Sequence, residues 1–177
     1  MSQAEIAGGT LNPPNEFPSR GHLFRDFALK STRGHDVQLS DYRGRVSLIV
    51  IFTDEKSGTA TWLLDLASQY EQLKKQQAEI LVVDWPIQRG PTPVERMQLP
   101  FPVLVDEKGE LHSEMGATDN LGNASAAVYI LDRFLEVFAS YRSRNQQVLP
   151  TGEEILSWLD FINSQCPECE PPEWPPL

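Results

Sequence analysis

The sequence is poor in cysteine: among 177 residues only Cys166 and Cys169 are cysteines, and two residues separate them. Thiols so close together cannot cross-link distant parts of a fold, which excludes a disulfide-stapled scaffold. Basic residues are also scarce, because 15 Lys and Arg face 25 Asp and Glu and the formal net charge is −10. Such an acidic surface repels nucleic-acid phosphates and anionic lipid, so we expect neither as a partner.

Long hydrophobic runs are missing as well. The longest runs, such as Val46 to Phe52, are far shorter than the roughly 20 residues that a membrane-spanning helix needs. The first residues, Met1 to Gly9, have neither the basic start nor the apolar stretch of a secretory signal. We therefore expect a cytoplasmic protein with no membrane partner.

The composition is that of a folded domain, with 40% hydrophobic and 23% charged residues. Residues 1–20 contain paired glycines and paired prolines, which predicts a flexible N-terminal arm. Residues 21–165 show no repeat and no linker, which predicts one domain. Residues 166–177 are rich in Pro and Glu and contain the Cys-Pro-Glu-Cys sequence, so we expect an extended tail that is not helical.

Buried-strand and helical patterns alternate along the domain. Nearly continuous apolar runs predict strands in one sheet, at 46–52, 80–85, 101–106, 127–132 and 135–141. Apolar residues spaced three and four apart predict helices at 60–76 and 152–164, and Thr151 with Glu154 predicts a capping box before the second helix. The fold class is therefore α/β, a central mixed sheet flanked by helices, in the order typical of a thioredoxin-like fold.

Four segments of the sequence are similar to one family. The first is Gly21 together with residues 26–29, and the second is residues 39–45, which lead into the strand that ends at Phe52. The third is residues 101–106 together with Gly109 and Glu110, and the fourth is residues 128–133. Together they resemble the redoxins, the alkyl hydroperoxide reductase/thiol-specific antioxidant (peroxiredoxin) relatives of thioredoxin. The resemblance covers about residues 20 to 164 and implies a thioredoxin-like fold.

The resemblance also implies a redox site that this chain lacks. The family places a cysteine just after the first core strand, at a helix N-terminus that stabilises the thiolate. Counting from Phe52, the positions of the family's Cys-x-x-Cys hold Ser57 and Ala60, and the position of its cis-proline holds Ala126. We interpret these residues as a vestigial active site, with Ser57 as a first-turn or capping residue, and we expect no peroxidase activity there.

Other polar residues near this position give little support for catalysis. Asp54, Glu55 and Lys56 are expected to form a solvated loop. The three histidines, His22, His35 and His112, are expected in loops or turns without the sequence context of a catalytic triad.

The remaining thiols, Cys166 and Cys169, leave three interpretations open. They are a dithiol/disulfide couple, half of a thiolate metal site completed by a second chain, or a pair without chemistry. Cys166 follows a predicted helix C-terminus, three glutamates follow it, and no Lys or Arg lies beyond Asn145. These local charges disfavour the thiolate, so we expect thiols that titrate at or above about 8.5 and a disulfide harder to reduce than that of thioredoxin.

Two classes of function follow. The first is a thiol-disulfide oxidoreductase of the antioxidant family, with Cys166 and Cys169 as catalytic residues and a protein thiol or disulfide as partner. The second is a redox-inactive binding or assembly module that uses the emptied cleft or the tail, with or without a metal site ligated by the two cysteines. Trp174 is an apolar side chain within the Pro-rich tail, and it could anchor the tail on its own domain, on another protein or on a second subunit. In the last case the protein would be a homodimer. We expect no cofactor in either case.

Overall fold

A mixed sheet of seven strands forms the centre of the protein, in the order β2-β1-β5-β4-β3-β6-β7. The computed structural model describes residues 17–54, 56–86, 90–143 and 148–165. The strands are β1 (Ala28–Ser31), β2 (Asp36–Gln38), β3 (Ser47–Phe52), β4 (Ala78–Asp84), β5 (Val103–Val105), β6 (Ala127–Leu131) and β7 (Val137–Arg142). The helices are α1 (Ser57–Ser68), α2 (Tyr70–Lys75), α3 (Pro93–Arg96), α4 (Glu110–Glu114), α5 (Gly152–Ser164) and the 3-10 helix η1 (Leu39–Tyr42).

The central strand is β3, which runs parallel to β4 and antiparallel to β6. Every residue of β3 is buried. A strand covered on both faces needs apolar side chains in both directions, which explains its unbroken run of apolar residues after Ser47.

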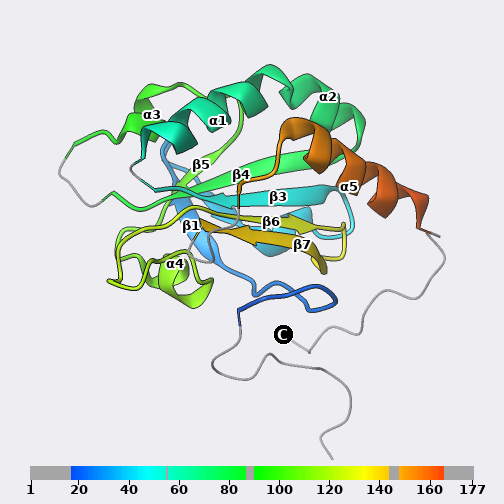
Figure 1. Cartoon of the computed structure of the whole chain (residues 1–177), viewed down its shortest axis with the longest axis horizontal. Coiled ribbons are helices and arrows are strands. Elements are labelled where there is room, and N and C mark those ends of the chain that lie inside the picture. The colour runs from blue at the N-terminus through cyan, green and yellow to red at the C-terminus, as the bar shows by residue number, and fades with distance from the viewer. Residues whose placement is uncertain (1–16, 55, 87–89, 144–147, 166–177) are drawn as a thin grey trace, which may run out of the picture.

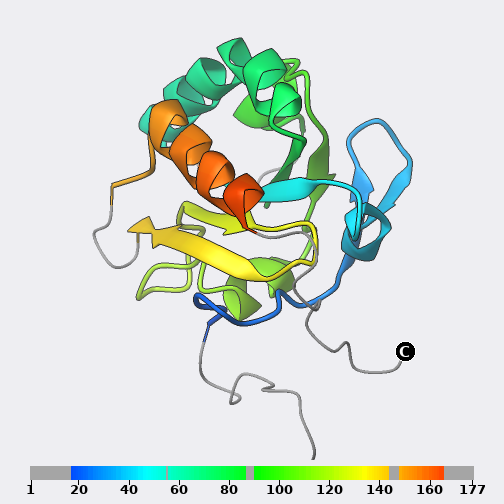
Figure 2. The same cartoon turned by 90° about the vertical axis from the view of Figure 1, so that its right-hand side faces the viewer.

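Helices cover both faces of this sheet. Figure 1 shows α1, α2 and α5 above the sheet and α4 below it, and the turned view in Figure 2 agrees. Alternate residues of β3 serve the two cores: Ile49 and Ile51 pack with α1 and α5, whereas Leu48, Val50 and Phe52 pack with α4. The period of two in a strand therefore divides one apolar run between two hydrophobic cores.

The predicted sheet and both predicted helical regions are confirmed, with three differences. The first helical region begins earlier than expected, at Ser57, and is interrupted at Gln69, so it forms α1 and α2. The hairpin of β1 and β2 was not predicted, because both strands are short and largely exposed. The short helix α4, which begins four residues after the predicted strand at 101–106, was not predicted either.

The last helix is fixed at both ends. Its predicted capping box is present, with the Glu154 amide donating to the Thr151 hydroxyl and the Thr151 amide donating to the Glu154 carboxylate. At the other end, the side-chain amide of Asn163 donates to the carbonyl of Gln76 at 3.1 Å. Gln76 lies just before β4, so α5 ends beside the amino ends of β3 and β4.

Part of the predicted arm lies within the described residues. The ring of Phe17 lies against Gly116, and the guanidinium of Arg142 lies 5.1 Å from the centre of that ring. Pro18 is buried. Residues 1–16 and 166–177 lie outside the described residues, so the arm and the tail as separate segments stay predictions. Within the described part of the chain, no helix is both long and apolar enough to cross a bilayer.

Candidate functional site

Polar side chains gather at one edge of the sheet, where β3, β4 and β5 end. The three strands run parallel, so their carboxyl ends lie together. Thr53 follows β3, Asp84 ends β4 and Asp106 follows β5, and all three are buried. Ligands of open α/β sheets bind outside the carboxyl ends of the strands, so this edge, here called the polar edge, is the candidate site.

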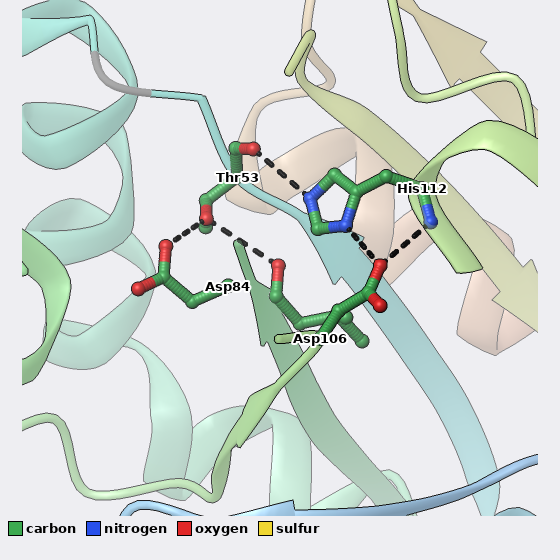
Figure 3. A network of polar contacts seen from close by, with 5 residues as sticks. Thr53, Asp84, Asp106 and His112 are labelled. Atoms are coloured by element: carbon green, nitrogen blue, oxygen red, sulfur yellow. Dashed lines mark hydrogen bonds and ion pairs between the residues drawn. The ribbon is translucent and has the colours of Figure 1, made fainter. Parts of the chain in front are cut away.

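Asp84 binds two hydroxyl groups at the polar edge. The Thr53 hydroxyl donates to Oδ1 of Asp84 at 2.6 Å, and the Thr92 hydroxyl donates to Oδ2 at 2.6 Å (Figure 3 shows the first contact). Thr92 is also the N-cap of α3, where its hydroxyl accepts from the amide of Glu95. One buried carboxylate therefore joins the end of β3 to the start of α3.

A second carboxylate, Asp106, is bound by His112. The ring Nδ1 and the backbone amide of His112 lie 2.8 and 2.9 Å from the same oxygen, Oδ2 of Asp106. The ring Nε2 lies 3.3 Å from the carbonyl oxygen of Thr53 (Figure 3). Burial by itself raises the pKa of Asp106, but the hydrogen bonds from His112 outweigh burial and hold that pKa below its usual value.

The His112 ring is enclosed rather than placed for catalysis. Its side chain has no exposed surface, and the rings of Phe52 and Trp85 lie 5.1 and 5.6 Å from its centre. A ring with both nitrogens engaged and no access to solvent cannot reach a substrate. The expectation that all three histidines lie in loops is wrong for His112, which lies on α4 and ties this helix to the ends of β3 and β5.

The expectation of a solvated loop before α1 is wrong for Asp54. This residue is buried, and its Oδ1 accepts from the Thr59 hydroxyl at 2.6 Å and from the Lys56 amide at 3.1 Å. These two bonds bind the strand end to the first turn of α1. Lys56 itself is exposed, as expected.

The fold brings the three predicted vestigial positions to the polar edge. Ser57 is the first residue of α1, Ala60 lies in its first turn, and Ala126 precedes β6. Ala127 pairs with Phe52, so Ala126 lies at the carboxyl end of β3. The described residues contain no cysteine, so no thiol from them lies at this edge. It stays a prediction from the motif spacing that these three residues stand where the family has its redox residues.

The two predicted catalytic thiols, Cys166 and Cys169, lie outside the described residues. Gln165, the residue before Cys166, lies at the end of α5 beside the amino ends of β3 and β4. Figure 1 shows this end of α5 on the opposite side of the molecule from the start of α1. The chain therefore enters the Cys-Pro-Glu-Cys segment far from the polar edge.

The described side chains do not assemble a metal centre. Among residues 17–54, 56–86, 90–143 and 148–165, no three His, Cys, Asp or Glu side chains are grouped to hold an ion. At the polar edge the oxygens of Asp84 and the bound oxygen of Asp106 already accept hydrogen bonds from protein groups. The arrangement is a set of internal ties between strand ends and helix starts.

Comparison with known proteins gives a consistent result. Residues 21–139 match the AhpC/TSA family. The chloroplastic peroxiredoxin Q of Gentiana triflora is 25% identical over 189 residues, which cover 92% of this chain and 83% of the relative. Peroxidoxin BcpB from Mycobacterium tuberculosis superposes with a TM-score of 0.66 at 15% identity, over 83% of this chain and 97% of that chain. Peroxiredoxin Q from Xanthomonas campestris gives a TM-score of 0.60 at 18% identity, over 78% and 90%. The structural likeness confirms the predicted thioredoxin-like fold.

Proposed function

The chain belongs to the AhpC/TSA family, and on this basis we propose that it is a thiol-disulfide oxidoreductase whose redox couple is Cys166 and Cys169. The observation that supports this most strongly is the position of Ser57 at the start of α1, where the resemblance places the family's thiol. A hydroxyl cannot form the sulfenic acid or the disulfide on which the family's chemistry depends. Any thiol chemistry then belongs to the two cysteines that follow α5.

The proposed reaction is a two-step exchange with a partner disulfide. The thiolate of one cysteine of the pair attacks a sulfur of the partner, forms a mixed disulfide and releases the first partner thiolate. The other cysteine, as thiolate, attacks the mixed disulfide, closes a disulfide between Cys166 and Cys169 and releases the second partner thiol. Two electrons pass to the partner, and the protons of the two protein thiols end on the two product thiols.

The test is the reduction of a model disulfide, oxidised glutathione, by the full-length reduced chain. We expect Cys166→Ser and Cys169→Ser each to abolish release of the second glutathione, because neither variant can close the internal disulfide. The matched control is Ser57→Ala at the vestigial position, which should react as the wild type does. Loss of the reaction in Ser57→Ala, with both cysteines present, would show that the polar edge takes part and would overturn the proposal.

A redox-inactive binding or assembly module is the second candidate. It is favoured by the polar edge, whose buried Asp84 and Asp106 serve internal hydrogen bonds rather than an open reactive centre. The double variant Cys166→Ser/Cys169→Ser separates the two candidates. A binding module keeps its biological activity without thiols, whereas an oxidoreductase loses it.

Two further predictions concern the setting of the protein. We propose that it works in the cytoplasm, because its two neighbouring cysteines cannot form the disulfide framework typical of small secreted domains. We also propose that a second subunit is the first partner to test for the Pro-rich tail, by measuring the mass of the full chain in solution and of a chain that ends at Gln165.

A further inference from the structure

A cavity of about 320 Å³ lies where α5 ends, at the opposite end of the sheet from the polar edge. Its walls come from four parts of the chain. They are Ser47 at the start of β3, the segment Lys75–Gln77 before β4, Arg133 and Phe134 between β6 and β7, and Asn163 and Gln165 at the end of α5. Four segments that are distant in the sequence therefore meet around one hollow.

The charged groups around this cavity are mostly cationic. Arg45, Lys75 and Arg133 line it, and Asp132 is its only carboxylate among the described lining residues. Oδ1 of Asp132 accepts the backbone amides of Phe134 and Glu136 at 2.9 Å each, so one oxygen of this carboxylate is already engaged. Within the described part of the chain, none of the three cations makes a close ion pair. In a chain with a net charge of −10, three such cations around one cavity are a local excess of positive charge.

The chain leaves the described structure at the wall of this cavity. Gln165 is a lining residue, and its position is fixed because the neighbouring Asn163 bonds both the carbonyl and the side chain of Gln76. The next Cα, that of Cys166, is about 3.8 Å from the Cα of Gln165. Glu168 follows within roughly 11 Å, which is close to one Debye length at 0.1 M salt.

We propose that this cavity is the docking site for residues 166–170 of the same chain, with Arg45, Lys75 and Arg133 as counter-ions for Glu168 and Glu170. The segment has two carboxylates and no base, and the three cations that line the cavity make no close ion pair among the described residues, while the Arg133 guanidinium lies 5.0 Å from the centre of the Phe134 ring. The segment also starts at the cavity wall, so its effective concentration there is high. The inference concerns the same cysteines as the proposed function and gives them an environment.

That environment alters the charges expected around Cys166. The sequence places only glutamates near the thiols, whereas the fold brings three cations to the residue before Cys166. A nearby cation favours the thiolate and lowers a thiol pKa. Docking of the segment therefore predicts a Cys166 thiol that is more acidic and more reactive at neutral pH than local sequence charges indicate.

Zero-length carbodiimide coupling of the full-length reduced chain tests the docking directly. We expect an amide bond between Lys75 and Glu168 or Glu170, found by mass spectrometry of the digested monomer. Lys75→Arg keeps the charge and removes the reactive amine, so the bond should disappear. Mixing isotope-labelled with unlabelled chains shows whether the bond lies within one chain. A bond between two chains, or no bond in the wild type, overturns the proposal.

Alkylation by iodoacetamide at pH 7 tests the consequence for the thiols. Arg45→Gln/Lys75→Gln/Arg133→Gln should slow alkylation of Cys166 about three-fold or more, because neutral groups no longer favour the thiolate. The matched control replaces three exposed cations that do not line the cavity, Lys30, Arg96 and Lys108, and should leave the rate unchanged. Equal slowing by both variants would mean that net charge alone acts.

The outcomes also separate this inference from the proposed function. If the amide bond to Lys75 forms but the chain does not reduce oxidised glutathione, the docking proposal stands and the oxidoreductase proposal fails. If the chain reduces oxidised glutathione but no amide bond to Lys75 forms, the oxidoreductase proposal stands and the docking proposal fails.

Discussion

His112 and Asp106 join α4 to the end of β5 through one carboxylate oxygen, which lies 2.8 Å from the ring Nδ1 and 2.9 Å from the amide of His112. The same ring reaches the carbonyl of Thr53 after β3 with its Nε2. A single side chain thus holds two strand ends and a helix of five residues together. This contact is structural, because the ring has no exposed surface.

Removing the ring should therefore cost stability. His112→Leu leaves the buried Asp106 carboxylate without the ring hydrogen bond, and losing a hydrogen bond to a charged group costs about 1.5–3 kcal/mol of unfolding free energy. Urea denaturation followed by circular dichroism measures the loss. His22→Leu is the control, because among the described residues its ring hydrogen-bonds only to the exposed Ser19, and it should change stability by less than about 0.5 kcal/mol. A loss in His112→Leu as small as in the control would contradict the structural role.

The lowered pKa of Asp106 predicts a pH dependence of stability. A carboxyl group whose pKa is lower in the folded than in the unfolded chain stabilises the fold above its unfolded value and loses this effect as the pH falls through the folded value. The unfolding free energies of the wild type and Asp106→Asn should therefore differ most at about pH 5–7. The difference should shrink below the ordinary value of 3.8. A difference that stays constant from pH 7 to acid would mean that the charge of Asp106 contributes nothing.

Gly109 should not tolerate a side chain. It precedes α4 with a φ of +68°, a left-handed conformation that strains other residues, and an added Cβ would overlap the ring of Trp85. Gly34 is a matched control, because it has a φ of +90° and an added Cβ there meets nothing within 4 Å. Gly34→Ala should cost about 1–2 kcal/mol from the backbone alone, and Gly109→Ala clearly more. Equal losses in thermal unfolding would show that the ring of Trp85 moves aside freely.

Two capping boxes in the chain allow the Asp84 contact to be measured. Thr151 caps α5 and Thr92 caps α3 in the same way, but only the Thr92 hydroxyl also donates to Asp84. Thr151→Ala should cost about 1 kcal/mol of unfolding free energy. Thr92→Ala should cost about 1.5–3 kcal/mol more, as expected for a hydrogen bond to a charged group. The two variants would cost the same if the Asp84 contact were without effect.

The central sheet could be predicted because burial on both faces leaves a strong pattern. β3 is buried throughout, and apolar residues fill it after Ser47. Strands of three or four residues with exposed positions, such as β1 and β2, leave no comparable pattern. The same holds for α4, because five residues are too few to show helical periodicity.

The places of Ser57 and Ala126 in the fold could be predicted, whereas the polar contacts at the edge of the sheet could not. Motif spacing placed Ser57 and Ala126 at the edge where β3 ends, and the fold brings both positions there. The pairing of His112 with Asp106 was missed, although a carboxylate directly after a buried strand and a histidine beside the buried Leu111 were available signals. The cations of the cavity beside α5 could not be found, because Arg45, Lys75 and Arg133 are remote from Cys166 in the sequence and meet near it only in the fold.

Thiol counting combined with intact-mass and metal determination tests the central claim most directly, on protein purified without oxygen and then equilibrated with oxidised glutathione. The claim that Cys166 and Cys169 form the redox couple predicts two free thiols and no bound metal before equilibration. Afterwards it predicts no free thiol, a mass lower by two hydrogens and a peptide that links Cys166 to Cys169. Two thiols that stay free in excess oxidised glutathione, or a zinc ion held by two chains, would contradict it.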